Sequence, residues 1–355
     1  MNIARSDEVA VFCLTPGGVR LAQRLRAHMP LTCFTSEKLL APGFIAFDGS
    51  FGETLHEAFG HYRALVVIGA VGITVRTIAP LLNDKLTDPA VVVIDERGQH
   101  VISLLSGHVG GANALTCHLA GLLGADPVIT TATDVNQMAA LDMLTTQLDA
   151  TMQDFRHTVK TVNQMLISDR KVGLWWDAPF HHDRERCDVR GFIPLDSLDT
   201  RPELDALVCV SLRDSLPECL SEWALPVYKL VPRRAIAGIG CRRNTTLPVL
   251  MTLLTQQLAE NHLDPLALRA IGSVDIKKDE PALQQLALRW HIPFELFSVE
   301  TLRRHESRFP ASEFVRQTLG VGSVSQPVAW LMSEGQLVGT TLRQQGVTIT
   351  LGVLH

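Results

Sequence analysis

Short, unbroken apolar runs rich in valine and isoleucine alternate with helical segments through the first 135 residues. The runs occupy residues 9–14, 64–68, 90–94, 101–105 and 128–131. A run without polar alternation predicts a strand that is buried on both faces, as in a mainly parallel sheet covered by helices. Helical periodicity lies between them, near residues 19–29, 71–80 and 110–124. The first part of the chain is therefore predicted to be a doubly wound α/β domain.

The pattern changes after residue 141. Residues 141–167 are helical in pattern, and residues 175–231 are irregular, with prolines, charges and a pair of histidines. We expect this middle segment to pack on the first domain and to end near Pro232.

A smaller, three-layer α/β/α domain is predicted from Ala235, where a strand, a turn and a helix follow one another. Later strands are expected at residues 270–276, 328–332 and 347–353. The predicted parts of the chain are an N-terminal domain, a middle segment and a C-terminal domain, at residues 1–145, 146–232 and 233–355.

Length, charge and cysteine usage exclude several classes of protein. A chain of 355 residues exceeds the usual size of one hydrophobic core, so more than one domain is expected. The net charge of −5 gives no general attraction to nucleic acid or to anionic lipid. The most apolar stretch, residues 64–73, is far shorter than a membrane span, and Met1–Glu8 has no signal-peptide features. The seven cysteines form no CxxC pair, which favours reduced thiols and a cytoplasmic location.

A glycine-rich connection with the sequence SGHVGGAN joins a predicted strand to a helix. Such a loop leaves backbone N–H donors at the positive end of the helix dipole, which predicts a cradle for a carboxylate or a phosphate. His108 in this loop is the main candidate for proton transfer near neutral pH, with a hydrogen-bonding or structural role as the alternative. The candidate binding residues of the loop are Ser106, Gly107, Gly110, Gly111 and Asn113.

Two carboxylates are further candidates for proton transfer. Asp134 ends the motif TTATD, where it would serve as a base or as a helix cap. Asp95 follows another predicted strand, in a segment that also contains Arg76 and Lys85. Arg76 lies in an apolar helical stretch and suits bidentate carboxylate binding, and Lys85 is a second candidate ligand. Structural ion pairs are the alternative for both cations.

Two other strand-to-helix turns are candidate anion sites. The turn TPGG contains Gly17 and Gly18, whose backbone N–H groups would face an anion or simply form an ordinary turn. The turn GIGCRRNT contains Gly240, Arg242 and Arg243. It is not a dinucleotide fingerprint, because Arg243 takes the place of the third glycine, and it has no P-loop lysine. Its two arginines predict carboxylate binding.

A charged segment, SVDIKKDE, follows a later strand of the C-terminal domain. Asp275 and Lys277 in it are candidate ligand contacts, and a solvated run of charges is the alternative. Cys241 has no evident activating histidine, which favours a bystander thiol. The sequence contains no recognisable pattern of metal-ligating residues.

Six motifs together, in this order along the chain, resemble the cobalt-precorrin-5A hydrolase family of anaerobic cobalamin biosynthesis. The likeness covers residues 60–135 and 235 to the C-terminus, with a weaker match between them. Asn244 and Gln326 depart from the family pattern, which usually has a glycine and an acid at these positions. The motifs are VGITVRTIAPLLNDKLTDPAVVVIDERG, LLSGHVGGANAL, PVITTATD, GIGCRRNT, SVDIKKDE and SEFVRQTLGVGSVSQP.

The resemblance implies a hydrolase that opens the δ-lactone of a cobalt-corrinoid substrate and releases acetaldehyde to give cobalt-precorrin-5B. The substrate would carry the cobalt, so no protein-bound cofactor or metal is expected, and other enzymes of cobalamin biosynthesis are candidate partners. Its acetate and propionate arms would need cationic sites such as Arg76, Arg242 and Arg243. His108, or else Asp134 or Asp95, would handle the proton.

Two other classes of function stay open at this point. The same glycine and arginine loops would suit a non-catalytic corrinoid-binding or carrier protein, which acetaldehyde release would distinguish from an enzyme. A nucleotide- or sugar-phosphate enzyme is also compatible with a generic α/β fold, although neither a complete GxGxxG motif nor a P-loop is present.

Overall fold

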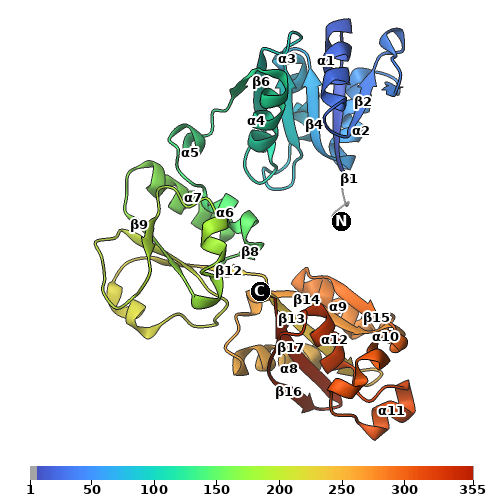
Figure 1. The fold of residues 1–355 in the computed structure, drawn as a ribbon, viewed down its shortest axis with the longest axis vertical. Coiled ribbons are helices and arrows are strands. Elements are labelled where there is room, and N and C mark those ends of the chain that lie inside the picture. The colour runs from blue at the N-terminus through green and yellow to red at the C-terminus, as the bar shows by residue number, and fades with distance from the viewer. Residues whose placement is uncertain (1–5, 355) are drawn as a thin grey trace. The chain divides into compact units, whose positions relative to one another are not determined.

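Three β-sheets organise the chain in the computed structural model, which describes residues 6–354 (Figure 1). The chain divides into two compact units, Met1–Met143 and Leu144–His355, close to the predicted limit of the first domain at residue 145. The middle segment belongs to the same unit as the C-terminal domain, and its packing on the first domain stays a prediction. The start of the Met1–Glu8 segment lies outside the described residues. None of the helices in residues 6–354 is long and apolar enough to cross a membrane.

The first unit contains a seven-stranded sheet with the order β3-β2-β1-β4-β5-β6-β7. Strands β1 to β5 run parallel to one another, which confirms the predicted mainly parallel sheet. Strand β6 runs antiparallel to β5, and β7 runs parallel to β6. The carboxyl ends of β6 and β7 therefore lie at the opposite edge of the sheet from those of β1, β4 and β5. The strands are β1 (Ser6–Cys13), β2 (Leu31–Thr35), β3 (Phe44–Ala46), β4 (Tyr62–Ile68), β5 (Ala90–Ile94), β6 (His100–Leu105) and β7 (Asp126–Val128).

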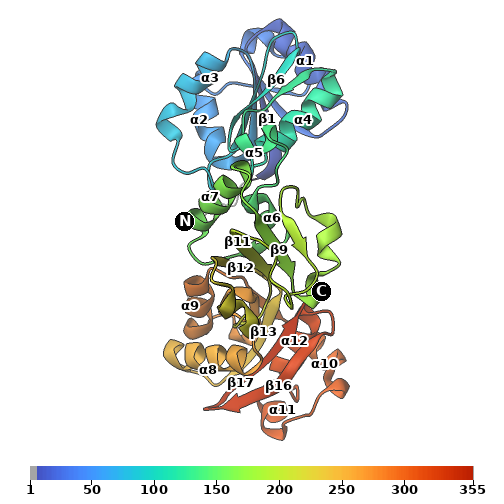
Figure 2. The same ribbon diagram turned by 90° about the vertical axis from the view of Figure 1, so that its left-hand side faces the viewer.

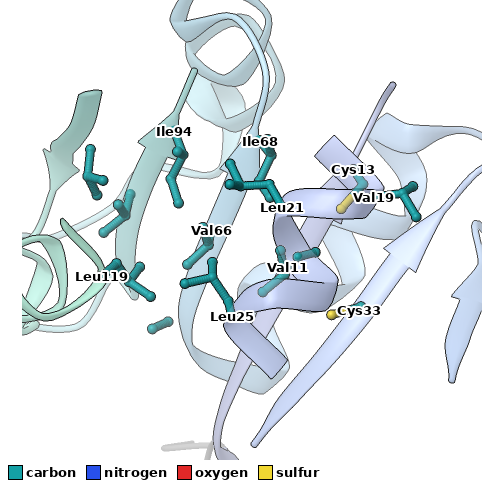
Figure 3. Close-up of a cluster of buried hydrophobic side chains, with 14 of the residues drawn as sticks. Val11, Cys13, Val19, Leu21, Leu25, Cys33, Val66, Ile68, Ile94 and Leu119 are labelled. Atoms are coloured by element: carbon teal, nitrogen blue, oxygen red, sulfur yellow. The ribbon is translucent and has the colours of Figure 1, made fainter. Parts of the chain in front are cut away.

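Helices cover both faces of this sheet. Two of them, α1 and α4, pack on one face against Val11, Val66 and Ile94 (Figure 3). On the other face, α2 and α3 pack against Phe12 and Leu65. All five side chains are completely buried, and burying each contributes about 1.5–3 kcal/mol, which explains the unbroken apolar runs. The helices of this part are α1 (Pro16–Arg26), α2 (Phe51–His61), α3 (Val71–Ile78), α4 (Ala112–Leu123), α5 (Ala132–Val135) and α6 (Leu141–Gln147).

The middle segment contains a second sheet, with the order β10-β9-β11-β12-β8, and the α-helix α7 (Phe155–Ile167). Four of its strands are parallel, and β8 pairs antiparallel at the edge. The prediction of an irregular segment is wrong, because strands this short, separated by proline-containing and charged turns, show no clear period. The strands are β8 (Ala150–Thr151), β9 (Val172–Trp176), β10 (Ile193–Leu195), β11 (Ala206–Val210) and β12 (Val227–Pro232).

The C-terminal domain has a five-stranded sheet with the order β15-β14-β13-β17-β16. Helices α8 and α9 lie on one face and α12 lies on the other, which gives the predicted three layers (Figure 2). The strands are β13 (Ala235–Cys241), β14 (Leu268–Val274), β15 (Phe294–Phe297), β16 (Leu337–Gln344) and β17 (Val347–Val353). The helices are α8 (Leu247–Glu260), α9 (Pro281–Trp290), α10 (Val299–Arg304), α11 (Glu313–Leu319) and α12 (Ser325–Met332).

The predicted strand at residues 328–332 is wrong, because these residues form most of helix α12. A five-residue apolar run fits a buried strand and one turn and a half of buried helix equally well. The structure places Ser325, Val328 and Ala329 on one buried face, at the spacing of a helix. The closing strand pair is instead β16 and β17.

Helix α12 approaches the sheet closely at Gly238 in β13. A Cβ atom added at Gly238 would collide with the backbone oxygen of Ser325 and would lie 2.7 Å from the backbone nitrogen of Ala329. Since backbone atoms cannot rotate away, this glycine is required by packing. The first glycine of the GIG motif therefore serves helix packing.

We expect Gly238→Ala to destabilise the second unit by about 1–3 kcal/mol, because the added methyl group forces α12 away from the sheet. All five tryptophans follow residue 144, so urea unfolding monitored by tryptophan fluorescence reports on this unit. Gly121→Ala is the control, since its added Cβ meets nothing within 4 Å and lies in the first unit. An unchanged midpoint for Gly238→Ala would contradict the packing argument.

Candidate active site

His108 lies in the loop between β6 and α4, with its side chain 16% exposed. Its Nδ1 lies 3.1 Å from Oδ2 of Asp142, and its Nε2 lies 3.0 Å from Oδ2 of Asp134. The Oγ1 atom of Thr133 lies 3.1 Å from the same Nε2. An ionised carboxylate can only accept hydrogen bonds. An imidazole ring with a carboxylate beside each of its nitrogens therefore carries a proton on both nitrogens and has a positive charge.

The surroundings of His108 favour its charged form. The hydrogen bond to Asp142 raises the pKa of His108 most strongly, and burial lowers it. The negative charge of Asp142 raises the pKa further, as do the hydrogen bond to Asp134 and the charge of Asp134. The net pKa of His108 is therefore above the ordinary histidine value of 6.5. A proton is held between two carboxylates at a pH where a free histidine would be neutral.

Asn113, at the start of α4, holds the second carboxylate in place. Its Nδ2 donates to Oδ2 of Asp134 and to Oγ1 of Thr131, each at 3.0 Å. Its Oδ1 accepts a 2.6 Å hydrogen bond from Oγ of Ser103. Both amide hydrogens of this buried side chain are therefore used inside the protein. The role of Asn113 as a ligand contact stays a prediction, and in the structure its amide is hydrogen-bonded to Asp134 and Thr131.

The strand directions explain why these residues meet. His108 follows β6 and Asp134 lies in α5, which follows β7; because β6 and β7 are parallel, both side chains come to one edge of the sheet. Asp134 lies within α5 rather than at its cap, which is Thr131. Asp142 comes from the first turn of α6 and was missed, because an acid in a first helical turn is the ordinary complement of the helix dipole.

The backbone of the glycine loop around His108 is hydrogen-bonded within the loop. The backbone N–H groups of Gly111, Ala112 and Asn113 donate to carbonyl oxygens of His108, Ser106 and Gly107, at 2.8, 3.1 and 2.9 Å. The sequence predicts free backbone N–H donors in this loop, but at these three positions the N–H groups already donate to carbonyl oxygens. Gly111 has a φ of 87°, in the left-handed region that favours glycine. Gly107 and Gly110 lie against Asn113 and Ser106, and Oγ of Ser106 is buried without a hydrogen-bond partner.

Asp95 lies at the opposite edge of the sheet, in the turn between β5 and β6. Its carboxylate accepts from the backbone N–H groups of Arg97, Gln99 and His100. Burial raises the pKa of Asp95, but these three hydrogen bonds outweigh it and hold the pKa below its usual value. The structure therefore separates Asp95 from His108 and gives it a role in the turn.

The other predicted residues of the first unit are also spread out. The turn with Gly17 and Gly18 follows β1, at the edge opposite to His108; Gly17 lies against Glu96, and the N–H of Gly18 donates to Thr15 Oγ1. Arg76 and Lys85 are exposed, in α3 and in the loop after it. Neither makes an ion pair within residues 6–354, so the structural ion pairs considered as the alternative are not seen there.

The predicted residues of the C-terminal domain follow β13 and β14, which are parallel and end at one edge. Gly240 is the last residue but one of β13, and the exposed guanidinium groups of Arg242 and Arg243 make no ion pair in the described part of the chain. Lys277 is buried, and its Nζ lies 2.8 Å from Oε2 of Glu280. Asp275 is exposed and accepts from the backbone N–H of Ile276. In the described part of the chain, the two arginines thus place positive charge without an ion pair at this edge, and Asp275 places negative charge there.

Of the two departures from the family pattern, the structure accounts for Asn244. Asn244 has a φ of 61°, a left-handed conformation that glycine adopts freely and that asparagine tolerates better than most residues. Its backbone N–H also donates to Glu280 Oε1 at 3.0 Å. Gln326 is partly buried at the start of α12, and its Oε1 accepts from Oγ of Ser323 at 3.5 Å. Nothing in the structure explains why Gln326 replaces an acid.

The fold and the His108 cluster define an α/β protein with a histidine between two carboxylates at one edge of its first sheet. Three family profiles match the chain: Cobalamin synthesis G N-terminal at residues 53–134, Cobalamin biosynthesis central region at 139–225 and Cobalamin synthesis G C-terminus at 235–352. The chain belongs to the cobalt-precorrin-5A hydrolase family.

Two curated relatives cover all or nearly all of the chain. The cobalt-precorrin-5A hydrolase of Salmonella typhimurium is 64% identical over 355 residues, which is 100% of both chains. The hydrolase of the same name from Priestia megaterium is 30% identical, over 99% of this chain and 96% of the relative. A crystal structure of a putative cobalamin biosynthesis protein G homolog from Sulfolobus solfataricus is 18% identical, with 98% of both chains covered and a TM-score of 0.37.

The charge on His108 makes the stability of the first unit depend on pH. Because the pKa of His108 is raised on folding, its stabilisation is fully present below about pH 6.5 and is lost as the pH rises through the folded-state pKa. His108→Gln keeps a hydrogen-bonding group without the charge. We expect wild type to exceed this variant in unfolding free energy by more at pH 6 than at pH 9, measured by urea unfolding with circular dichroism.

The exposed His118 on α4 provides the control, since His118→Gln should follow the wild type across the same range. A constant difference between wild type and His108→Gln from pH 6 to pH 9 would contradict a charged His108.

Proposed function

We propose that this chain acts as a cobalt-precorrin-5A hydrolase, which opens the δ-lactone of a cobalt-corrinoid substrate and releases acetaldehyde to give cobalt-precorrin-5B. The contact between His108 and Asp134 is the main support for this proposal. The 64% identity to a cobalt-precorrin-5A hydrolase over the whole chain supports it further. The pair supplies a proton donor beside a proton acceptor, which is what a lactone hydrolysis needs.

Lactone opening would use the two groups in complementary ways. Asp134, whose side chain is 38% exposed, accepts a proton from the attacking water as the new carbon–oxygen bond forms. Charged His108 donates its Nε2 proton to the departing ring oxygen as the acyl carbon–oxygen bond breaks. The products are a free carboxylic acid and a hydroxyl group, with the proton now on Asp134 and His108 neutral.

Acetaldehyde loss would return both groups to their starting states. Neutral His108 takes the proton of the new hydroxyl group, the carbon–carbon bond to the macrocycle breaks, and the electron pair stays with the macrocycle. Protonated Asp134 then supplies a proton to the macrocycle. Atoms and charge balance over the two steps without a covalent enzyme intermediate.

Binding would rest on cationic side chains that make no ion pair within residues 6–354. Arg242 and Arg243 suit the acetate and propionate arms, because guanidinium groups bind carboxylates in a bidentate manner. Arg76 and Lys85 are further proposed contacts. In this proposal the cobalt is part of the substrate, no protein-bound cofactor takes part, and the enzyme works in the cytoplasm beside other enzymes of the pathway.

The proposal is tested by incubating the protein anaerobically with the cobalt-precorrin lactone, trapping aldehyde and following the mass of the macrocycle. We expect acetaldehyde with the matching loss of mass from wild type. His108→Ala should lower the rate about 10²- to 10⁴-fold, the usual contribution of a general acid or base. His118→Ala, on the exposed face of the helix after the loop, should keep the wild-type rate.

Full turnover by His108→Ala would refute the assignment of His108. Tight binding of the lactone by wild type without aldehyde would refute the hydrolase and favour the carrier protein.

A further inference from the structure

The two carboxylates beside His108 are not equivalent. The Asp142 side chain is 8% exposed and faces Nδ1, whereas the Asp134 side chain is 38% exposed and faces Nε2. A large macrocyclic substrate can approach Asp134 and the Nε2 side of the ring, but a buried carboxylate on the far side is out of its reach. The exchange of protons with a ligand is thereby confined to one side of the imidazole.

We infer that Asp142 is a positioning residue, which fixes the imidazole ring of His108 and keeps a proton on Nδ1, so that Nε2 is the atom that exchanges protons with the substrate. The inference rests on the proposed function for the identity of the substrate. Its geometric basis, the 3.1 Å contact of Nδ1 with Asp142, stands independently. Asp142 acts through His108 and touches no reacting atom.

The choice of tautomer follows from hydrogen-bonding chemistry. If Nδ1 lost its proton, its lone pair would face a carboxylate oxygen 3.1 Å away, and two acceptors would repel each other. With the proton on Nδ1, the nitrogen donates and the ring is held in one orientation. When His108 becomes neutral, the proton that leaves is therefore the one on Nε2.

The charged groups that act on the ring come from two elements. Asp134 belongs to α5 and Asp142 belongs to α6, and the uncharged Thr133 of α5 lies against Nε2. Removing the charge of Asp142 leaves Asp134 as the remaining carboxylate at the ring. The ring then loses its anchor on the buried side while its solvent side is unchanged.

Two substitutions separate the charge of Asp142 from its hydrogen bond. Asp142→Asn keeps an oxygen that accepts from Nδ1 but removes the charge, and Asp142→Ala removes both. Asp88→Asn is the matched control. Asp88 is a similarly buried aspartate of the same unit, and among the described residues its carboxylate accepts only from the backbone N–H groups of Asn83 and Asp84.

The first measurement is nitrogen NMR of the His108 ring across a pH titration of the intact protein. In wild type we expect Nδ1 to stay protonated on both sides of the titration while Nε2 titrates. In Asp142→Asn the midpoint should move to lower pH, and in Asp142→Ala both tautomers should appear; Asp88→Asn should match wild type. Wild type with Nδ1 unprotonated after the titration would overturn the inference, even if neither variant folds.

The second measurement is the kinetics of acetaldehyde release. Asp142→Ala should lower kcat about 100-fold with little change in KM, because the ring is misplaced while substrate contacts are intact. Asp142→Asn should lose less and should shift the pH–rate profile to lower pH. Unchanged kcat and pH profile in both variants would overturn the role of Asp142. If wild type itself releases no acetaldehyde, the proposed function fails, and the NMR result alone decides the positioning of the ring.

Discussion

The turn between β5 and β6 is the constraint on which the candidate site depends. Asp95 closes this turn by accepting from three backbone N–H groups, and the chain reverses there. Without the reversal, β6 would continue the parallel order, and the loop with His108 would emerge at the other edge, beside Gly17. Because β7 follows β6 in parallel, Asp134 comes to the edge where His108 lies.

The charge balance of the cluster determines what it can do. One imidazolium lies between two carboxylates, so the group carries a net negative charge and can give up a proton on one side and accept one beside it. Asn113 holds Asp134 by a hydrogen bond, which leaves the carboxylate in place when His108 changes charge. Such a pair suits a reaction that needs an acid and a base in turn.

Much of the first domain was predictable, because strands buried on both faces leave unbroken apolar runs such as residues 90–94. His108 and Asp134 were also predictable, since polar residues at strand ends follow from the same pattern. Asp142 was not, because it lies 34 residues from His108 and only the folded chain brings them together. The second sheet and α12 were missed since their apolar segments are too short to show a period, and the packing role of Gly238 depends on a helix nearly 90 residues later.

We propose that Asp134 and His108 together catalyse the addition of water to the lactone. Single-turnover reactions of wild type and Asp134→Asn in water enriched in ¹⁸O test it most directly, with the macrocycle followed by mass. We expect wild type to place one ¹⁸O atom in the carboxyl group freed from the lactone, and Asp134→Asn to form this product at least about 100-fold more slowly. Labelled product at the wild-type rate from Asp134→Asn would exclude Asp134 as the base that activates water.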